Sequence, residues 1–386
     1  MSARVREHCA AIAGLGMTEM GKVYGRSARS LAAESIRLAV ADAGLALADV
    51  DGLLVSHGVT PVGLSLPHDL GLTDLRLLSS MNAYGATAGS MVAYAALAVE
   101  SGLATTVACV FADAPLSPAR GAGAVYGGGR ALTGWGGLIG ASAIAGVNPL
   151  YALAARRHMH AYGTTTEQLG AIAVAQRAWA AGNPAAQMRE PMTLDDHAGS
   201  RWIAEPLRKL DCCLVSNGAV AVVVTTAERA AALAQPPVRI AGFAQDHPGR
   251  SLVRHDDFGL RTGAAISGPA ALAMAGVGLA DVDVVQLYDC YTYTVLVSLE
   301  DYGFCAKGEG GPFAASGALG PGGSLALNTG GGQLSGYYMW GFTPLSEAVI
   351  QVRGQGGDRQ VDRHDVCLVS GNGGVLDHHA TLVLTS

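Results

Sequence analysis

Several proton-carrying side chains stand together where one apolar run ends. Tyr288 closes the run VVQLY and is followed at once by Asp289 and Cys290. A tyrosine phenol has a pKa near 10 when free, and it becomes a useful acid or base when a neighbouring hydrogen-bonding group lowers that pKa. The simpler interpretation is a core aromatic with a satisfied hydroxyl, because tyrosines end many strands. Taken alone, these residues favour the simpler interpretation.

The other reactive side chains predict no metal site. The seven cysteines include no CxxC pair and stand at positions 9, 109, 212, 213, 290, 305 and 367. That pattern indicates reduced thiols rather than a zinc site or a disulfide framework. Cys290 is a possible nucleophile, but a free cysteine is more commonly a small buried hydrophobe. Either His378 or His379 could reach a pocket, but a surface pair at the start of a strand is the better interpretation.

Composition excludes several classes of function. The chain of 386 residues carries a net charge of −6 with no run of Lys or Arg, so nucleic acid and anionic membranes are poor partners. Two uncharged stretches, 77–99 and 131–155, are rich in small residues and indicate buried elements rather than membrane spans. The first residues lack the apolar region of a signal peptide, which predicts a cytoplasmic protein. Gly14-Leu15-Gly16 lacks the third glycine and the acidic ribose ligand of a dinucleotide fingerprint, so NAD is not expected as a cofactor.

The chain contains an internal duplication. Residues 43–56 (AGLALADVDGLLVS) and 275–288 (AGVGLADVDVVQLY) are identical at seven of fourteen positions. Each copy predicts the end of a helix, a short turn and a strand-sized apolar run. Each is followed by a Gly-rich segment, opened by Asn82 or Asn328, and then by a predicted helix and strand. The order helix, strand, Gly-rich loop, helix, strand therefore occurs twice.

The duplication predicts an α/β fold in layers. The apolar runs are nearly free of charge, as in sheets covered on both faces. A helix without charge over 77–99 must be buried on all sides, which two sheets sandwiching shared central helices would achieve in a five-layer αβαβα arrangement. We expect one half at 1–114 and 214–235, the other at 236–386, and an inserted loop domain at 115–213. The insertion holds a Gly-rich stretch at 121–129 and predicted helices at 150–162 and 166–181, and it is long enough to cover a site. After it, the run GAVAVVVTT predicts a strand at 218–226, and a short Ala-rich helix is expected at 268–275.

Several motifs resemble the thiolase superfamily along essentially the whole chain. They are GLGMTEMGK at 14–22, SRWIAEPLRKLDCC at 200–213 and CLVSGNGG at 367–374. LYDCYTYTVLVSLEDYGFCAKGEGG at 287–311 and NTGGGQLSGYY at 328–338 resemble the sterol-carrier-protein type of thiolase and its lipid-transfer-protein-like aldolase relatives. The resemblance implies the thiolase fold.

The chain departs from the thiolase pattern at each catalytic position. The family's spacing places Gly85 where a thiolase has its nucleophilic cysteine, at the start of the helix after the first Gly-rich loop. Tyr338 stands at the position of the catalytic histidine, and Ser370 at that of the second catalytic cysteine. Tyr288 stands where relatives carry Asn or His. Claisen chemistry through an acyl-enzyme is therefore not expected.

The lipid-transfer-protein aldolases have the same pair of tyrosines, which implies retro-aldol cleavage of a β-hydroxyacyl-CoA, such as a steroid side-chain thioester. In this reading Tyr288 is the base and Tyr338 the acid, in an order that could be reversed. Asp289 orients a tyrosine or caps the turn. The backbone of the loop that Ser370 heads is an oxyanion site, at the residues Gly371, Asn372 and Gly373. No cofactor is implied besides the CoA thioester substrate.

Two other functions remain open from the sequence. One is a non-catalytic subunit that binds acyl-CoA or lipid through a decayed site, and the other is an atypical condensing acyltransferase that uses Cys290. The resemblance also implies a small OB-fold partner of the domain-of-unknown-function-35 type. The expected assembly is a homodimer core, with two such partners forming a heterotetramer.

Overall fold

The computed structural model describes residues 9–119, 125, 137, 141–142, 144, 146–248 and 257–386. The strands are β1 (Ala10–Met17), β2 (Gly52–His57), β3 (Leu77–Ser80), β4 (Val107–Asp113), β5 (Trp202–Ala204), β6 (Leu207–Arg208), β7 (Gly218–Thr226), β8 (Val238–Asp246), β9 (Val284–Gln286), β10 (Ala326–Leu327), β11 (Val366–Gly373) and β12 (His378–Thr385). The helices are α1 (Ala28–Asp42), α2 (Leu66–Leu70), α3 (Thr87–Glu100), α5 (Asn148–Tyr162), α6 (Thr166–Ala181), α7 (Leu194–Gly199), α8 (Ala227–Ala230), α9 (Ala264–Ala275), α10 (Thr292–Tyr302), α11 (Gly310–Ala315) and α12 (Phe342–Val352).

The strands of the two halves follow the same order from edge to centre. The ten-stranded sheet runs β10-β9-β11-β12-β8-β1-β7-β4-β2-β3, so β3-β2-β4-β7-β1 mirrors β10-β9-β11-β12-β8. In each half the three outer strands are parallel and the inner pairings are antiparallel. The halves join where β1 pairs with β8, through Ala11 with Arg239 and Ile12 with Val238. This repetition confirms the duplicated α/β fold.

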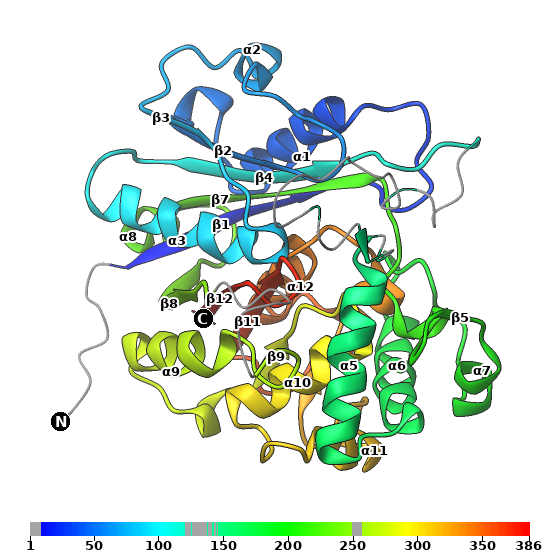
Figure 1. The fold of residues 1–386 in the computed structure, drawn as a ribbon. Coiled ribbons are helices and arrows are strands. Elements are labelled where there is room, and N and C mark those ends of the chain that lie inside the picture. Colours follow the sequence, from blue (N-terminus) through cyan, green and yellow to red (C-terminus); the bar gives the residue numbers. More distant parts are fainter. Residues whose placement is uncertain are drawn as a thin grey trace.

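The helices form the layers that the duplication predicts (Figure 1). Helix α1 packs against β1, β4 and β7 on one outer face, and α9 packs against β8 and β12 on the other. Helices α3 and α12 lie between and contact strands of both halves. The expectation that the uncharged stretch 77–99 is one helix buried on all sides is wrong. Residues 77–80 form the edge strand β3, and Tyr94 and Leu97 on α3 are 36% and 49% exposed.

The inserted segment packs beside the C-terminal half (Figure 1). Helix α6 contacts α10, α11 and the turn at 332–336. Its start is fixed by Thr165 and Gln168, which cap each other's backbone N–H groups. Asp211 then accepts a hydrogen bond from Thr292 Oγ1 (2.7 Å), which ties the end of the insertion to α10.

Most predicted elements are present with small differences at their ends. The helices predicted at 150–162 and 166–181 correspond to α5 and α6, and the strand predicted at 218–226 is β7. Helix α9 begins at Ala264, earlier than expected, and continues through Pro269. The Gly-rich stretch 121–129 lies outside the described residues except for Val125, and the proposed domain boundaries stay predictions. No helix in the described ranges is long and apolar enough to cross a membrane.

Candidate active site

The two tyrosines meet, although fifty residues separate them in the chain. The hydroxyl oxygens of Tyr288 and Tyr338 are 3.2 Å apart, within hydrogen-bonding distance. Tyr288 lies just after β9 and is 4% exposed, while Tyr338 follows the turn at 332–336 and is half-buried. Thr294 at the start of α10 donates its hydroxyl to the backbone oxygen of Tyr288 (3.2 Å). The pair can share or pass a proton, as the sequence comparison implied.

Gly85 faces the ring of Tyr288. It lies in the single turn Tyr84–Ala86 that leads into α3. A Cβ atom at position 85 would come within 2.3 Å of Cε2 and Cζ of Tyr288 and within 2.1 Å of the backbone oxygen of Asn372. The Tyr288 ring therefore occupies the space into which a side chain at position 85 would extend. A cysteine nucleophile and Tyr288 cannot both be accommodated in this arrangement.

Asp289 holds the turn that leads to Tyr338. Its fully buried carboxylate accepts hydrogen bonds from the backbone N–H of Gln333 (2.9 and 2.8 Å) and of Leu334 (3.2 Å). Burial raises the pKa of Asp289 to about 7, and the backbone N–H groups oppose that rise. Gly332 is required beside it, because its φ is +57° and a Cβ there would lie 2.1 Å from Asp289 Oδ2. Asp289 was expected either to orient a tyrosine or to cap the turn, and these contacts are those of a capping residue.

The structure does not bring Ser370 to the tyrosine pair. Glycines 371 and 373 of β11 face the backbone of Ala83–Ala86, and side chains alternate along a strand. Ser370 and Asn372 therefore project to the opposite face, where Ser370 Oγ lies 3.0 Å from His379 Nε2. The backbone oxygen of Asn372 points at Gly85, so the group placed there is an acceptor. The oxyanion role of this loop stays a prediction.

Near this region the buried imidazole of His379 is a poor base, and the buried thiol of Cys290 is a poor nucleophile. His379 is 1% exposed rather than on the surface as expected, and burial lowers its pKa to about 3. Burial raises the pKa of the Cys290 thiol to about 12, which disfavours the thiolate needed for attack. Among the residues that the structure describes, no group of three or more His, Cys, Asp or Glu side chains could hold a metal ion.

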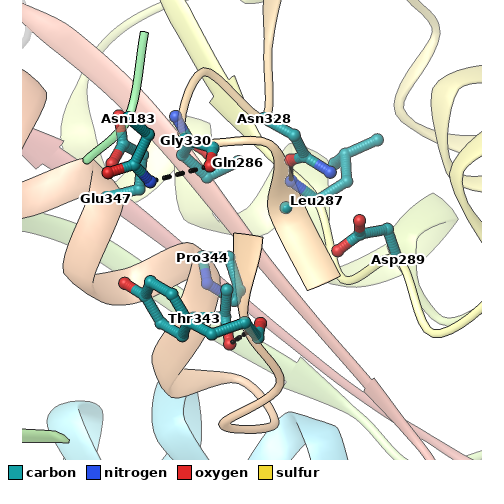
Figure 2. A pocket seen from close by; sticks show the side chains of 11 residues that line it. Asn183, Gln286, Leu287, Asp289, Asn328, Gly330, Thr343, Pro344 and Glu347 are labelled. Carbon is teal, nitrogen blue, oxygen red and sulfur yellow. Dashed lines mark hydrogen bonds between the residues drawn. The ribbon is translucent and has the colours of Figure 1, made fainter. Parts of the chain in front are cut away.

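A small cavity lies behind Asp289 (Figure 2). Its volume is about 10 Å³, room for a single water molecule, and its wall includes Asp289, Asn328 and Thr343. A larger pocket of about 280 Å³ adjoins the turn at Gly85 and is lined by Asn82, Thr87, Ser90, Gln245, His247 and His378 together with Met81 and Ala83. The cavity is too small for a thioester, whereas the larger pocket has room for part of an organic substrate.

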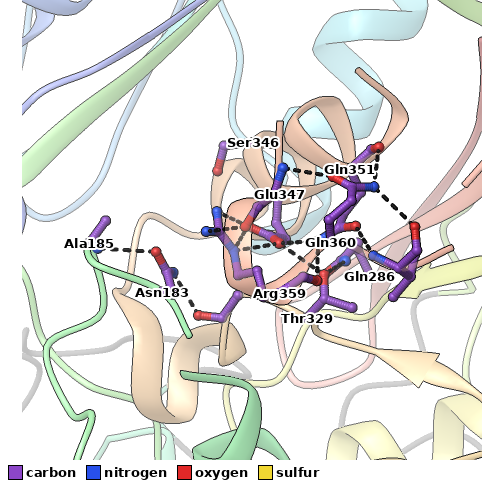
Figure 3. A network of polar contacts seen from close by, with 12 residues as sticks. Asn183, Ala185, Gln286, Thr329, Ser346, Glu347, Gln351, Arg359 and Gln360 are labelled. Atoms are coloured by element: carbon purple, nitrogen blue, oxygen red, sulfur yellow. Dashed lines mark hydrogen bonds and ion pairs between the residues drawn. The ribbon is translucent and has the colours of Figure 1, made fainter. Parts of the chain in front are cut away.

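A buried ion pair fixes the Gly-rich loop that begins at Asn328 (Figure 3). Glu347 on α12 accepts two guanidinium hydrogen bonds from Arg359, at 3.0 Å each, and both residues are less than 9% exposed. Thr329 donates to the same carboxylate (2.9 Å), and Asn183 Nδ2 donates to the backbone oxygen of Gly330 (2.9 Å). This network anchors the loop before the turn that carries Tyr338. The ion pair of Glu347 and Arg359 was not predicted from the sequence, because a lone Glu in an apolar helix does not indicate which basic residue will pair with it.

Ser216 is a second residue that the sequence analysis missed. Its hydroxyl oxygen accepts a hydrogen bond from the backbone N–H of Tyr338 (3.0 Å). The surrounding letters NGAVAVVV were noticed only as a strand, and a serine before a strand carries no signal for a contact 122 residues away.

Comparison with known proteins finds thiolase-like and aldolase relatives over nearly the whole chain. The family model described as "Thiolase C-terminal domain-like" matches residues 244–386. The chain is 39% identical over 378 residues to a "Steroid side-chain-cleaving aldolase" of Thermomonospora curvata, covering 94% of this chain and 95% of the relative. It is 38% identical to the "17-hydroxy-3-oxo-4-pregnene-20-carboxyl-CoA lyase" of Mycobacterium tuberculosis, covering 94% and 96%. The solved structure of an "Ltp2-ChsH2(DUF35) aldolase" superposes with a TM-score of 0.88 at 36% identity and covers 99% of each chain.

Proposed function

The chain belongs to the thiolase superfamily, in the branch of the steroid side-chain-cleaving aldolases, and on that basis we propose that it cleaves a β-hydroxyacyl-CoA by a retro-aldol reaction. The products are a ketone or aldehyde and a shorter acyl-CoA. The observation that carries the proposal is the tyrosine pair, 3.2 Å apart, with one ring lying over Gly85 at the position of the thiolase nucleophile. The names of the two relatives make a steroid side chain the first substrate class to test.

The reaction needs two proton transfers and no covalent intermediate. A phenolate removes the proton of the β-hydroxyl group, the Cα–Cβ bond breaks, and its electron pair passes into the thioester as an enolate. The departing carbon becomes a carbonyl, and a phenol then protonates Cα. We assign Tyr288 as the base and Tyr338 as the acid. Their direct contact allows the proton taken by one to return through the other.

The enolate requires hydrogen-bond donors. We propose the backbone N–H groups of Gly371–Gly374 for this role, because this segment lies at the end of β11 beside Gly85. The Asn372 oxygen that faces Gly85 is an acceptor and does not serve it. The raised pKa of Cys290 argues against the condensing reaction through that thiol. Seven free cysteines fit a reducing compartment, and we propose a cytoplasmic location.

We further propose that the site is completed by other chains. The pocket of about 280 Å³ is smaller than the roughly 300–1,000 Å³ typical of small-molecule sites. The structural relative at TM-score 0.88 is an aldolase with a DUF35 component, which supports an OB-fold partner of that type here. Apolar side chains left exposed on β3 and α3 (Leu78, Tyr94 and Leu97) support a homodimer through this edge, and hence a heterotetramer.

The test uses the purified chain together with any co-purifying OB-fold protein. A panel of tertiary β-hydroxyacyl-CoAs, with steroid and smaller alicyclic groups, is incubated and short acyl-CoA release is followed by mass spectrometry. We expect release to fall about 100-fold or more in Tyr288→Phe and in Tyr338→Phe. Tyr293→Phe is the matched control, because it removes another buried tyrosine hydroxyl, one that bonds the backbone oxygen of Gly259. Bound but unchanged acyl-CoA would instead support a non-catalytic binding subunit.

A further inference from the structure

The segment 213–217, where the insertion ends and the chain returns to the N-terminal half, contacts both parts of the chain that carry the tyrosines. The backbone N–H of Cys213 donates to the backbone oxygen of Cys290 (3.0 Å), two residues after Tyr288. The N–H of Leu214 donates to the oxygen of Gln333 (2.9 Å), within the turn that precedes Tyr338. This segment is therefore hydrogen-bonded to the chain on either side of the site, near Tyr288 and near Tyr338.

Ser216 makes the contact nearest to Tyr338. Its hydroxyl oxygen accepts from the Tyr338 N–H (3.0 Å) and from Gln187 Nε2 (2.5 Å), and the residue is 1% exposed. The backbone N–H of Gln187 also donates to the oxygen of Gly336 (2.9 Å). Ser216 and Gln187 thus fix the backbone on both sides of Tyr337. A buried N–H that loses its acceptor is costly, so these bonds limit how far Tyr338 can shift.

The two tyrosines are held by different means. The ring of Tyr288 lies against the backbone at Gly85, and its own backbone oxygen is bonded by Thr294. Tyr338 is only half-buried, so its position depends more on its backbone. The distance between the two hydroxyls is then set largely by the residues that hold the Tyr338 backbone.

We propose that Ser216 is a positioning residue for the tyrosine pair, acting through the backbone of Tyr338 with Gln187 as its support. This inference rests on the proposed aldolase function for its kinetic consequences. Ser216 itself touches neither reacting group. Displacing a catalytic group by about 1 Å can cost about 100-fold in rate, so loss of this one acceptor has a measurable effect.

The kinetic test compares Ser216→Ala with Ser216→Thr, which keeps the hydroxyl, in the complex that turns over substrate. We expect kcat of Ser216→Ala to fall about 10- to 100-fold with KM within about twofold, and Ser216→Thr to recover most of the loss. Ser267→Ala is the control, because Ser267 is fully buried and its hydroxyl bonds Gly263, just before α9, and Thr381 in β12. A kcat within twofold of the natural protein for Ser216→Ala would overturn the proposal. If Ser216→Ala does not fold, Ser216→Cys replaces it, with kcat expected between those of the Thr variant and an inactive enzyme.

A second readout does not depend on turnover. The chain is labelled with 3-fluorotyrosine, and the resonances of positions 288 and 338 are assigned by their Phe variants. We expect the Tyr338 resonance and its titration midpoint to move in Ser216→Ala and to stay unchanged in Ser267→Ala. Unchanged resonances in both variants would overturn the positioning role. A shifted resonance in a chain that cleaves no substrate would retain the positioning role and reject the aldolase function.

Discussion

The two Gly-rich loops that begin at Asn82 and Asn328 occupy equivalent places in the two halves and are held very differently. In the first loop Asn82 and Tyr84 are exposed, and its backbone is bonded by nearby side chains of the same segment, those of Asn82, Thr87 and Ser90. In the second, Asn328 and Thr329 are buried, and side chains from the insertion (Asn183), β9 (Gln286) and α12 (Glu347) all bond the loop. The half that carries the reacting groups is thus the more constrained one. The other half contributes mainly space, at Gly85.

Removing the anchor of the second loop is expected to have the greatest effect on stability. Arg359→Ala leaves Glu347 charged and buried without its partner, which costs about 3–5 kcal/mol in comparable cases. Arg156→Ala removes a pair with Glu205 that is more than half exposed, and about 0–1 kcal/mol is expected. Urea unfolding of both variants measures the difference. Equal losses would show that the buried network does not hold the loop.

A side chain at Gly85 is expected to reduce activity strongly without restoring thiolase chemistry. Gly85→Cys forces the Tyr288 ring to move, because the new Cβ would lie 2.3 Å from it. Overpacking of this kind costs about 1–3 kcal/mol, and displacement of the tyrosine reduces kcat about 100-fold. Gly320→Cys is the control, since a Cβ at Gly320 has nothing within 4 Å.

A double variant distinguishes steric conflict from other causes. Adding Tyr288→Ala to Gly85→Cys removes the clash with the ring but leaves the Cβ 2.1 Å from the backbone oxygen of Asn372, so only part of the unfolding free energy is expected to return while the chain stays inactive as an aldolase. If the single Gly85→Cys variant keeps its activity, the loop at Asn82 has more freedom than the contacts indicate.

The sequence predicted those features that depend on local pattern or on repetition. The repeat at 43–56 and 275–288 predicted the order of elements in both halves, and the resemblance to the lipid-transfer-protein-like aldolases implied the pair of Tyr288 and Tyr338 that the structure brings to 3.2 Å. The short edge strands β3 and β10 were not predicted, because four and two residues carry too little periodicity to recognise. The exposure of Tyr94 was missed since charge content alone does not tell which face of a helix is covered.

Side-chain direction within a motif was the main feature that the sequence could not give. Ser370 heads the last Gly-rich loop, and a shift of one position in a strand reverses the face to which a side chain points. The structure places Ser370 beside His379, away from the tyrosines. Ser216 and Arg359 contact residues more than ten positions away in the chain, and a single sequence does not show which distant residues will meet.

The pH dependence of stability tests how Asp289 holds the second loop. Because burial raises its folded-state pKa from 3.8 to about 7, the carboxyl binds a proton more tightly in the folded chain than in the unfolded one. Its contribution to the free energy of unfolding is therefore fully present below about pH 4 and is lost as the pH rises through about 7. Asp289→Asn removes this titration and places an amide against the N–H groups of Gln333 and Leu334, at a cost of about 1–3 kcal/mol.

We expect the stability deficit of Asp289→Asn to be greatest near pH 4 and to shrink toward pH 8, as measured by urea unfolding at a series of pH values. Parallel curves for the variant and the natural protein would mean that Asp289 has an ordinary pKa in the folded chain.

The two asparagines that open the loops provide the most direct test, with the smallest expected effects. Asn328 has a φ of +49° and accepts the backbone N–H of Leu287 (2.7 Å), so Asn328→Ala loses a buried acceptor and strains the backbone, at about 1–3 kcal/mol. Asn82 is exposed, and its side-chain oxygen accepts a hydrogen bond from the backbone N–H of Tyr84 (3.0 Å). Asn82→Ala is therefore expected to cost about 0.5 kcal/mol or less. The value of kcat should follow stability, because only the Asn328 loop leads to a reacting tyrosine. KM is measured alongside, since Asn82 lines the pocket of about 280 Å³ and its loss is expected to raise KM instead. If Asn82→Ala lowers kcat as much as Asn328→Ala does, the first loop takes part in the reaction beyond making room for the Tyr288 ring.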